Sequence, residues 1–307
     1  MALSPKWQFR LNRLRNRWQA QKERARQTEQ SLTTEQKMCP SCRALVPRGK
    51  ANCPYCGQRL QVFGTGPAGK LVKRALPGGS IPVTGVLILA NFVMFVLEYA
   101  VSGTSLLTNL MGSPSANATL RLGESLPTPY IIASGQYWRW ITACFLHGGL
   151  LHIGFNMWAL YDIGPLVESF YGGAKYLTLY LLTGIFGYMV SGYFGYNSLG
   201  ASGAIMGLIG LMIAYGMRRS HTAAGRQLRS VATRWAFYVI VFSFLPGVDI
   251  FAHIGGLASG FVLGMMVEDD PPQSEGQIRF WNLAQLVMVG VVAVSFYAMV
   301  KFYFRTA

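Results

Sequence analysis

The sequence contains little charge, and most of the charge that it does contain is positive. Charged residues make up only 13% of the 307 residues, whereas 51% are hydrophobic and the mean hydropathy is +0.31. Average soluble domains have about 25% charged residues, so this composition excludes an ordinary soluble globular protein. Acidic residues are especially few. The sequence has 12 Asp and Glu and 27 Lys and Arg, which gives a net charge of +15.

The positive charge is concentrated in the first 80 residues. Residues 1–80 hold 16 of the 27 Lys and Arg but only Glu23, Glu29 and Glu35 as acids. On charge alone, such a segment suits nucleic acid or an anionic membrane face. Because an apolar body follows it, we expect a lipid bilayer and no nucleic acid as its partner. The Arg-rich N-terminus has no early apolar core, so we expect no cleavable signal peptide.

Long apolar runs make up the rest of the chain. A membrane-spanning helix needs roughly 20 mostly apolar residues. On this basis we predict seven spans, at 81–101, 150–168, 174–194, 201–217, 231–246, 250–267 and 281–303. Basic residues in short loops favour the cytoplasmic side, and five arginines follow the fourth span. The N-terminus and this loop are therefore predicted to be cytoplasmic.

Cysteine is scarce, with five residues, but four of them form a motif. Cys39, Cys42, Cys53 and Cys56 have the spacing C-x2-C-x10-C-x2-C, which is typical of two knuckles around one tetrahedral zinc. Disulfides are the alternative, but a cytoplasmic segment is in a reducing compartment. We therefore predict one structural Zn²⁺ in this segment and no cofactor for catalysis. Cys144 is interpreted as a packing residue.

These patterns divide the chain into five segments. They are a basic amphipathic helical segment at 1–36, a zinc-ribbon-like domain at 37–60, a linker at 61–80, a core of six transmembrane helices at 81–268 and an additional transmembrane helix at 279–304. The first segment places Trp7, Leu11, Leu14 and Trp18 at helical spacing among Arg and Lys. Such a helix suits either anionic lipid or a cytoplasmic partner, and both remain open.

Histidine is also scarce, and its few positions are informative. His221 lies in the basic loop, whereas His147, His152 and His253 fall at or near the outer ends of predicted membrane segments. Ser202 begins the fourth span between glycines. Spans two, four and six all run from outside to inside, so His152, Ser202 and His253 are expected at a similar depth. Ionisable residues inside a membrane are costly and usually functional.

The spacing of these polar residues fits acyl-transfer chemistry. His152 and Asn156 are four residues apart and share one helix face. A serine needs a base to become a nucleophile, and histidine is the usual one. The side chains of His152 and Asn156, with the backbone N–H of Ser202, are candidate donors to an oxyanion. Packing alone is the alternative for each residue taken singly.

Small residues on the sixth span are expected to bring the histidine to the serine. Gly256 and Gly260 form a small-xxx-small pair, which lets two membrane helices approach closely. His253 lies about one turn before Gly256, on much the same face. We assign no carboxylate as a third member, since Asp249 lies in the loop before this span.

Four motifs together resemble the rhomboid family of intramembrane serine proteases. They are QYWRW in the long first loop, HIGFN on the second span, GASG on the fourth and AHIGGLASG on the sixth. The resemblance covers about residues 81–268. It implies an all-α polytopic membrane protein with a six-helix bundle. To this the chain adds one C-terminal transmembrane helix and a small N-terminal zinc-ribbon-like cytoplasmic domain.

The resemblance also implies roles for individual residues. Ser202 and His253 would form a catalytic dyad, and His152, Asn156 and the Ser202 amide would form the oxyanion hole. Structural roles are expected for Trp138 and Arg139 of the first loop, for Glu168, which matches an acidic residue that ties loop ends, and for Gly200, Gly256 and Gly260. Met206 stands where some relatives carry an aromatic residue against the catalytic histidine, and a methionine can fill that space.

The function implied is a serine endopeptidase that cleaves single-span membrane proteins in or near their transmembrane segment. We expect its active site to open to the external face of a membrane, with a bacterial plasma membrane as the expected location. One alternative is a catalytically inactive rhomboid-like protein that binds membrane helices. Another is a zinc-regulated transporter in which intramembrane His and Asn line a path. Reaction with a serine-directed probe separates the protease from both.

Overall fold

The computed structural model describes residues 36–38, 45–47, 53–56, 82–103, 112–245 and 247–306. The chain divides into two compact units, residues 1–80 and 81–307. In the first unit, strand β1 (Gln36–Met38) pairs in antiparallel fashion with strand β2 (Leu45–Pro47). The predicted linker, Cys39, Cys42 and all of the predicted basic helical segment except Gln36 lie outside the described residues.

The regular elements described in the second unit are all helices, apart from one isolated β-bridge between Ser125 and Ser198. Its long helices are α3 (Val83–Ser102), α7 (Leu150–Tyr171), α8 (Gly173–Tyr193), α9 (Ser202–Arg218), α10 (Ala223–Phe242), α11 (Ile250–Met266) and α12 (Glu275–Arg305). The all-α prediction is confirmed for this unit. Among the described helices, α3 and α12 are long and apolar enough to cross a membrane, whereas α9 and α11 are apolar but only 17 residues long.

Two helices begin earlier than hydropathy predicts. Helix α10 starts eight residues before position 231 because Thr222 caps it, its hydroxyl accepting a hydrogen bond from the Gly225 N–H at 3.0 Å. The first turns of α10 are basic, so they are missed by a search for apolar residues. Helix α12 starts before position 281 because Ser274 and Gln277 form a capping box.

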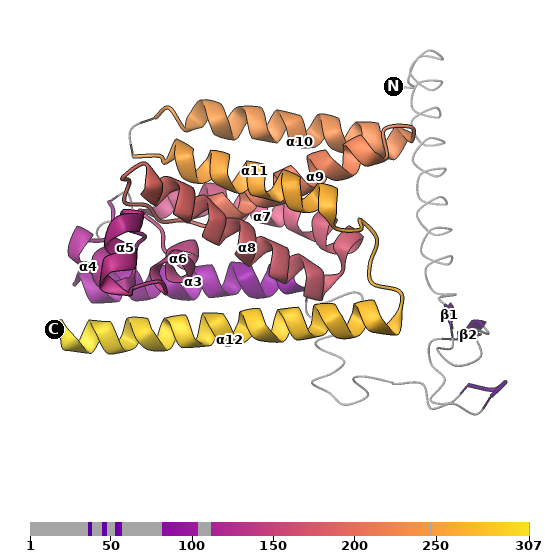
Figure 1. Ribbon diagram of the computed structural model, residues 1–307, viewed down its shortest axis with the longest axis horizontal. Coiled ribbons are helices and arrows are strands. Elements are labelled where there is room, and N and C mark those ends of the chain that lie inside the picture. Colours follow the sequence, from indigo (N-terminus) through magenta and orange to yellow (C-terminus); the bar gives the residue numbers. More distant parts are fainter. Residues whose placement is uncertain are drawn as a thin grey trace, which may run out of the picture. The chain divides into compact units, whose positions relative to one another are not determined.

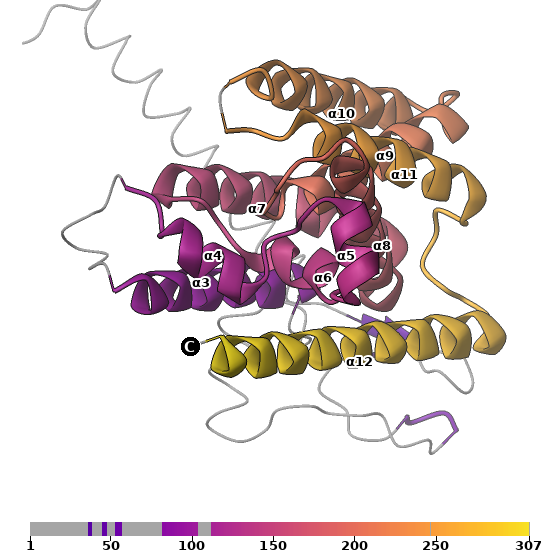
Figure 2. The ribbon, with the colours of Figure 1, turned by 60° about the vertical axis from the view of Figure 1, so that its left-hand side comes forward.

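The long first loop folds into short helices. They are α4 (Ala116–Leu122), α5 (Thr128–Ser134), α6 (Arg139–Thr142) and the 3₁₀ turn η1 (Ala143–Phe145). Helices α4 and α6 contact α12 near its C-terminal end (Figures 1 and 2). There the Phe302 ring lies 5.6 Å from the Trp138 ring, and Arg121 donates a hydrogen bond to the Tyr303 carbonyl at 3.0 Å. The last helix therefore packs against the first loop.

Helix α11 packs against α8 and α9, and glycines of both helices line its contact with α9. A Cβ atom on Gly256 would overlap the carbonyl oxygen of Gly203, and one on Gly260 would overlap that of Gly207. The two backbones are therefore in direct contact along two turns. The small-xxx-small spacing predicts such an approach, and the structure identifies α9 as the neighbour.

Candidate active site

The two predicted catalytic side chains meet where α9 and α11 begin. Ser202 is the first residue of α9, and His253 lies in the first turn of α11. The Ser202 Oγ is 2.7 Å from the His253 Nε2. The imidazole is buried, with only 5% of the residue exposed, while Ser202 is half-buried. This is the distance at which a histidine can take a proton from a serine hydroxyl.

The turn before Ser202 is shaped by Gly200. Its φ is +129°, a conformation that favours glycine, and its N–H donates to the Ala143 carbonyl at 2.9 Å. The Tyr188 hydroxyl donates to the Gly200 carbonyl. A Cβ atom on Gly200 would lie only 2.8 Å from the His152 Nε2. Glycine at this position therefore admits the His152 ring beside the start of α9.

Hydrogen bonds orient the two predicted oxyanion side chains on α7. The Gly148 N–H donates to the His152 Nδ1 at 3.2 Å, so a neutral His152 carries its proton on Nε2. That nitrogen faces Gly200. The Asn156 amide donates one N–H to the His152 carbonyl at 3.1 Å, which leaves its second N–H for another acceptor.

Sequence reasoning missed a residue that contacts the histidine from the side away from Ser202. Ser243 follows the last residue of α10, and its Oγ is 2.6 Å from the His253 Nδ1. A signal for it existed, because a short connection joins α10 to α11 and so places Ser243 at the same end of the helices as His253. A serine in an apolar run was too ordinary to single out.

Asp249 has a different role from that of a triad carboxylate. Its Oδ1 caps α11 by accepting the N–H groups of Phe251 and Ala252 at 2.9 and 3.1 Å. The hydroxyl of Ser191 donates to its other oxygen. The position beside the His253 Nδ1 is taken by Ser243.

Trp138 and Arg139 lie in the first loop. The buried Arg139 guanidinium donates to the carbonyls of Leu120 and Glu124 at 2.8 and 3.1 Å, and to the Gln136 side chain at 2.6 Å. It also lies over the Trp138 ring, 4.7 Å from the ring centroid. Arg139 thus ties the end of α4 to α6.

Glu168 lies inside the last turn of α7, whereas the hydropathy boundary put it at the end of the span. Its carboxylate accepts hydrogen bonds from the N–H of Val83 at 2.7 Å and from the N–H and hydroxyl of Thr84 at 3.0 and 2.8 Å. It therefore caps α3. Met206 is fully buried in the core, and its contact with the histidine stays a prediction.

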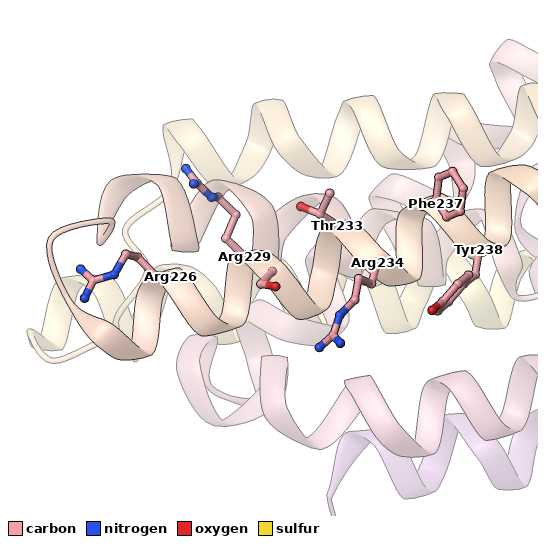
Figure 3. A pocket seen from close by; sticks show the side chains of 7 residues that line it. Arg226, Arg229, Thr233, Arg234, Phe237 and Tyr238 are labelled. Atoms are coloured by element: carbon pink, nitrogen blue, oxygen red, sulfur yellow. The ribbon is translucent and has the colours of Figure 1, made fainter.

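A shallow groove on α10 contains none of the predicted site residues. Its volume is about 660 Å³, and it is lined by Arg226, Arg229, Ser230, Thr233, Arg234, Phe237 and Tyr238 (Figure 3). No acidic residue occurs between positions 218 and 242. Arg226 and Arg229 lie in the segment that the charge pattern predicts to be cytoplasmic, whereas Phe237 and Tyr238 lie within the predicted span 231–246.

Comparisons with known proteins place this chain among rhomboid sequences. The Rhomboid domain model matches residues 134–269. Rhomboid protease GluP of Bacillus subtilis is 39% identical over 138 residues, 43% of this chain and 26% of GluP. RHOMBOID-like protein 6, mitochondrial, of Arabidopsis thaliana is 33% identical over 177 residues, 56% of each protein. The putative rhomboid protease YdcA of Bacillus subtilis is 32% identical over 138 residues, 44% of this chain and 69% of YdcA.

The extent of these matches differs between relatives. The chain spans about a quarter of GluP and about half of the Arabidopsis protein, but more than two thirds of YdcA. The segment matched by the domain model contains all four motifs and both members of the Ser202–His253 pair. The chain belongs to the rhomboid family.

Proposed function

We propose that the protein is an intramembrane serine endopeptidase that cleaves single-span membrane proteins in or near their transmembrane segment. The observation that carries this proposal is the 2.7 Å separation of the Ser202 Oγ and the His253 Nε2. The names of the relatives, which include proteases of bacteria, agree with it. A serine paired with a histidine and lying beside oriented N–H donors is the arrangement that acyl transfer requires.

In the proposed reaction, His253 takes the hydroxyl proton as the Ser202 Oγ attacks the scissile carbonyl carbon. The tetrahedral intermediate collapses when the C–N bond breaks and His253 gives its proton to the leaving amine. The product is an ester between Ser202 and the substrate. Water, deprotonated by His253, then attacks this ester, and the C–O bond to Ser202 breaks as His253 returns the proton to the Ser202 Oγ, which releases the carboxylic acid and the free serine.

The oxyanion would be held by donors from two helices. The backbone N–H of Ser202 begins α9, where the first N–H groups of a helix have no partner within it. The His152 Nε2–H faces the same turn, because its Nδ1 accepts from Gly148. Asn156 supplies one N–H, since its other one holds the His152 carbonyl. This hydrogen bond orients the Asn156 amide, whereas the His152 ring is oriented by Gly148.

Rhomboid proteins are integral membrane proteins, and we propose that the seven long helices described for residues 83–305 all span the bilayer. At about 1.5 Å per residue, the 17 residues of α9 and of α11 make helices of about 26 Å. This is slightly less than the roughly 30 Å hydrocarbon core, so water can reach a site at their first residues. The arginines after α9 favour a cytoplasmic N-terminus. The active site then opens to the external face of a membrane, which we propose to be a bacterial plasma membrane.

We further propose that the N-terminal unit holds one structural Zn²⁺ through Cys39, Cys42, Cys53 and Cys56. Strands β1 and β2 form a hairpin with Met38 opposite Leu45, so the first Cys pair falls in the connection between them. Cys53 directly precedes a described turn, and Cys56 ends it. Within the described residues no group of three metal-ligating side chains occurs, and two of these four cysteines lie outside that set. Four thiolates would close the tetrahedron and leave no position for catalysis.

The test of the proposed function is cleavage by the full chain in proteoliposomes containing a single-span substrate. We expect Ser202→Ala and His253→Ala each to lower cleavage by more than about 1,000-fold, because neither a nucleophile nor its base has a substitute. A fluorophosphonate should label the wild type but neither of these two variants. Ser169→Ala, which removes an exposed serine on α7, is the control. Cleavage by Ser202→Ala within tenfold of the wild type would overturn the covalent mechanism.

A further inference from the structure

The side of the His253 ring that faces away from Ser202 is occupied by a single buried hydroxyl. Ser243 is 4% exposed, and its Oγ is 2.6 Å from the His253 Nδ1. The other ring nitrogen, Nε2, is 2.7 Å from the Ser202 Oγ. The imidazole of His253 is therefore held between two serines, one at the start of α9 and the other directly after α10. Only one of these can be the nucleophile in the proposed reaction.

The hydrogen bonds of Ser243 decide which ring nitrogen of His253 carries the proton. The Ser243 Oγ also lies 2.6 Å from the Val239 carbonyl oxygen, one turn back along α10. A serine hydroxyl has one proton, and a carbonyl oxygen has none to donate. The Ser243 proton must therefore point at the Val239 carbonyl oxygen. Without a proton between them, the lone pairs of the Ser243 Oγ and of this oxygen would repel each other at 2.6 Å. The lone pairs of Ser243 then face the His253 Nδ1.

It follows that neutral His253 donates from Nδ1 and accepts at Nε2. With the proton on Nδ1, the lone pair of Nε2 points at the Ser202 hydroxyl, which is the arrangement that a general base needs. The opposite tautomer would place a proton between Nε2 and the Ser202 Oγ, and the base would be lost. The chain Ser202–His253–Ser243–Val239 thus has one consistent direction of donation.

In a Ser-His-Asp triad, the group at this position is a carboxylate, which fixes the tautomer and stabilises the imidazolium. In this chain Asp249 is engaged at the N-terminus of α11 and with Ser191. A neutral hydroxyl fixes the tautomer as well as a carboxylate does, but it stabilises the imidazolium less. Its loss should therefore have a smaller effect than the loss of a triad carboxylate.

We propose that Ser243 is a positioning residue that holds His253 in the Nδ1–H tautomer and keeps its Nε2 directed at Ser202. This role rests on the proposed function, since it assigns Ser243 an effect on catalysis only through His253. As Ser202 loses its proton to Nε2, the Nδ1–H of the imidazolium continues to donate to Ser243. The same hydrogen bond persists when Nε2 returns the proton to the leaving amine.

The test compares Ser243→Ala with Ser295→Ala in the full chain. Ser295 is a matched control, because it is also 4% exposed and also donates to the carbonyl four residues back, at 2.8 Å, but it lies on α12. We expect Ser243→Ala to lower kcat by roughly 10- to 100-fold, with KM changed less than twofold. Such a loss matches that of one buried hydrogen bond. Ser295→Ala should leave kcat unchanged, and Ser243→Thr, which restores a hydroxyl, should recover part of the rate.

A spectroscopic measurement separates orientation from packing. ¹⁵N NMR of histidine-labelled protein, with His253 assigned by difference from His253→Ala, should show the proton on Nδ1 in the wild type and a mixture of tautomers in Ser243→Ala. A kcat within twofold of the wild type, an equal loss in Ser295→Ala, or an unchanged tautomer in Ser243→Ala would each overturn the role of Ser243. So would a folded Ser243→Thr variant no faster than Ser243→Ala. If Ser202→Ala is still active, the proposed function itself fails, and this outcome is distinct from the others.

Discussion

Helix α11 contacts α9 through its backbone, whereas the end of α10 contacts His253 of α11 through a side chain. Between α9 and α11, glycines put backbone directly against backbone, at Gly256 on Gly203 and at Gly260 on Gly207. The end of α10 instead contributes a side-chain hydroxyl, that of Ser243, which lies 2.6 Å from the His253 Nδ1. The separation of α9 and α11, and with it the approach of His253 to Ser202, is therefore set by main-chain packing. The direction in which the imidazole ring faces depends on a single hydroxyl.

The outer surface of α10 reinforces this contrast. In Figures 1 and 2, α10 lies on the side of the second unit opposite to α12. Three of its aromatic side chains are exposed, with Phe237 at 63%, Tyr238 at 54% and Phe242 at 58%. The glycines of α9 and α11 are instead enclosed by neighbouring backbone. A change at the glycine contact must move a helix, whereas a change at Ser243 need only turn a ring.

The largest effect is expected from a single methyl group in the glycine contact. Gly256→Ala would place its Cβ against the Gly203 carbonyl, so α11 must shift away from α9 and His253 must move with it. We expect the free energy of unfolding to fall by roughly 1–3 kcal/mol, and cleavage to fall by more than about 100-fold. Thermal unfolding in detergent and the cleavage assay measure the two effects.

Gly290→Ala is the control for this prediction. It makes the same chemical change in the middle of α12, where nothing lies within 4 Å of the added Cβ. At this position the free energy of unfolding should rise by roughly 0.5–1 kcal/mol, because alanine loses less conformational entropy on folding than glycine does. If Gly256→Ala is as stable and active as Gly290→Ala, the backbone contact does not set the geometry of the site.

The contrast also explains how much of the site can be predicted from the sequence. The Ser202–His253 pair follows from a topology in which alternate spans run in the same direction, together with a glycine pattern that has a known packing geometry. Ser243 has no such pattern around it, because a hydroxyl next to a histidine depends on the angle at which α10 ends. Tyr188, which holds the Gly200 carbonyl, looks in sequence like any aromatic residue of an apolar helix.

The limits of helices show a similar division. Hydropathy locates the apolar middle of each helix but misses polar turns that caps begin, as at Thr222 before α10 and Ser274 before α12. The short helices of the first loop are held by Arg139, which donates to carbonyls that no sequence pattern marks. These features depend on where distant backbone groups lie, and local sequence does not contain that information.

A smaller effect is expected where a side chain, not a backbone contact, joins two helices. In Glu168→Gln one carboxylate oxygen becomes an NH₂ group, which cannot accept from the N–H groups of Val83 and Thr84. We expect a loss of about 1–2 kcal/mol in the free energy of unfolding, typical of a lost helix cap with one unpaired donor. Cleavage should fall less than tenfold, because α3 carries neither Ser202 nor His253.

The control for the cap is Asp162→Asn, which removes an exposed carboxylate from the same helix. Its free energy of unfolding should stay within about 0.5 kcal/mol of the wild type, as for most surface substitutions. Equal losses in the two variants would mean that the negative charge of α7, and not the cap on α3, accounts for the effect of Glu168→Gln.

The smallest effect is expected at the ion pair that follows α11. Arg219 donates to Asp269 at 2.9 Å and to Asp270 at 2.8 Å. Burial opposes ionisation of Asp269, but its hydrogen bonds with Arg219 outweigh this, and the pKa of Asp269 is lowered from its ordinary value. A carboxylate whose pKa is lower in the folded state stabilises the fold above the pKa of the unfolded chain, about 4. This contribution is lost as the pH falls through the folded pKa.

The contribution of this ion pair should be small. Because Arg219 is 34% exposed, the pair should add less than about 1 kcal/mol to the free energy of unfolding. Between pH 6 and pH 3, we expect the unfolding temperature of the wild type to fall slightly more than that of Asp269→Asn. Asp270→Asn, at a side chain that is 57% exposed, should follow the wild type. Parallel curves for all three proteins would show that this ion pair adds nothing to the anchoring of α11.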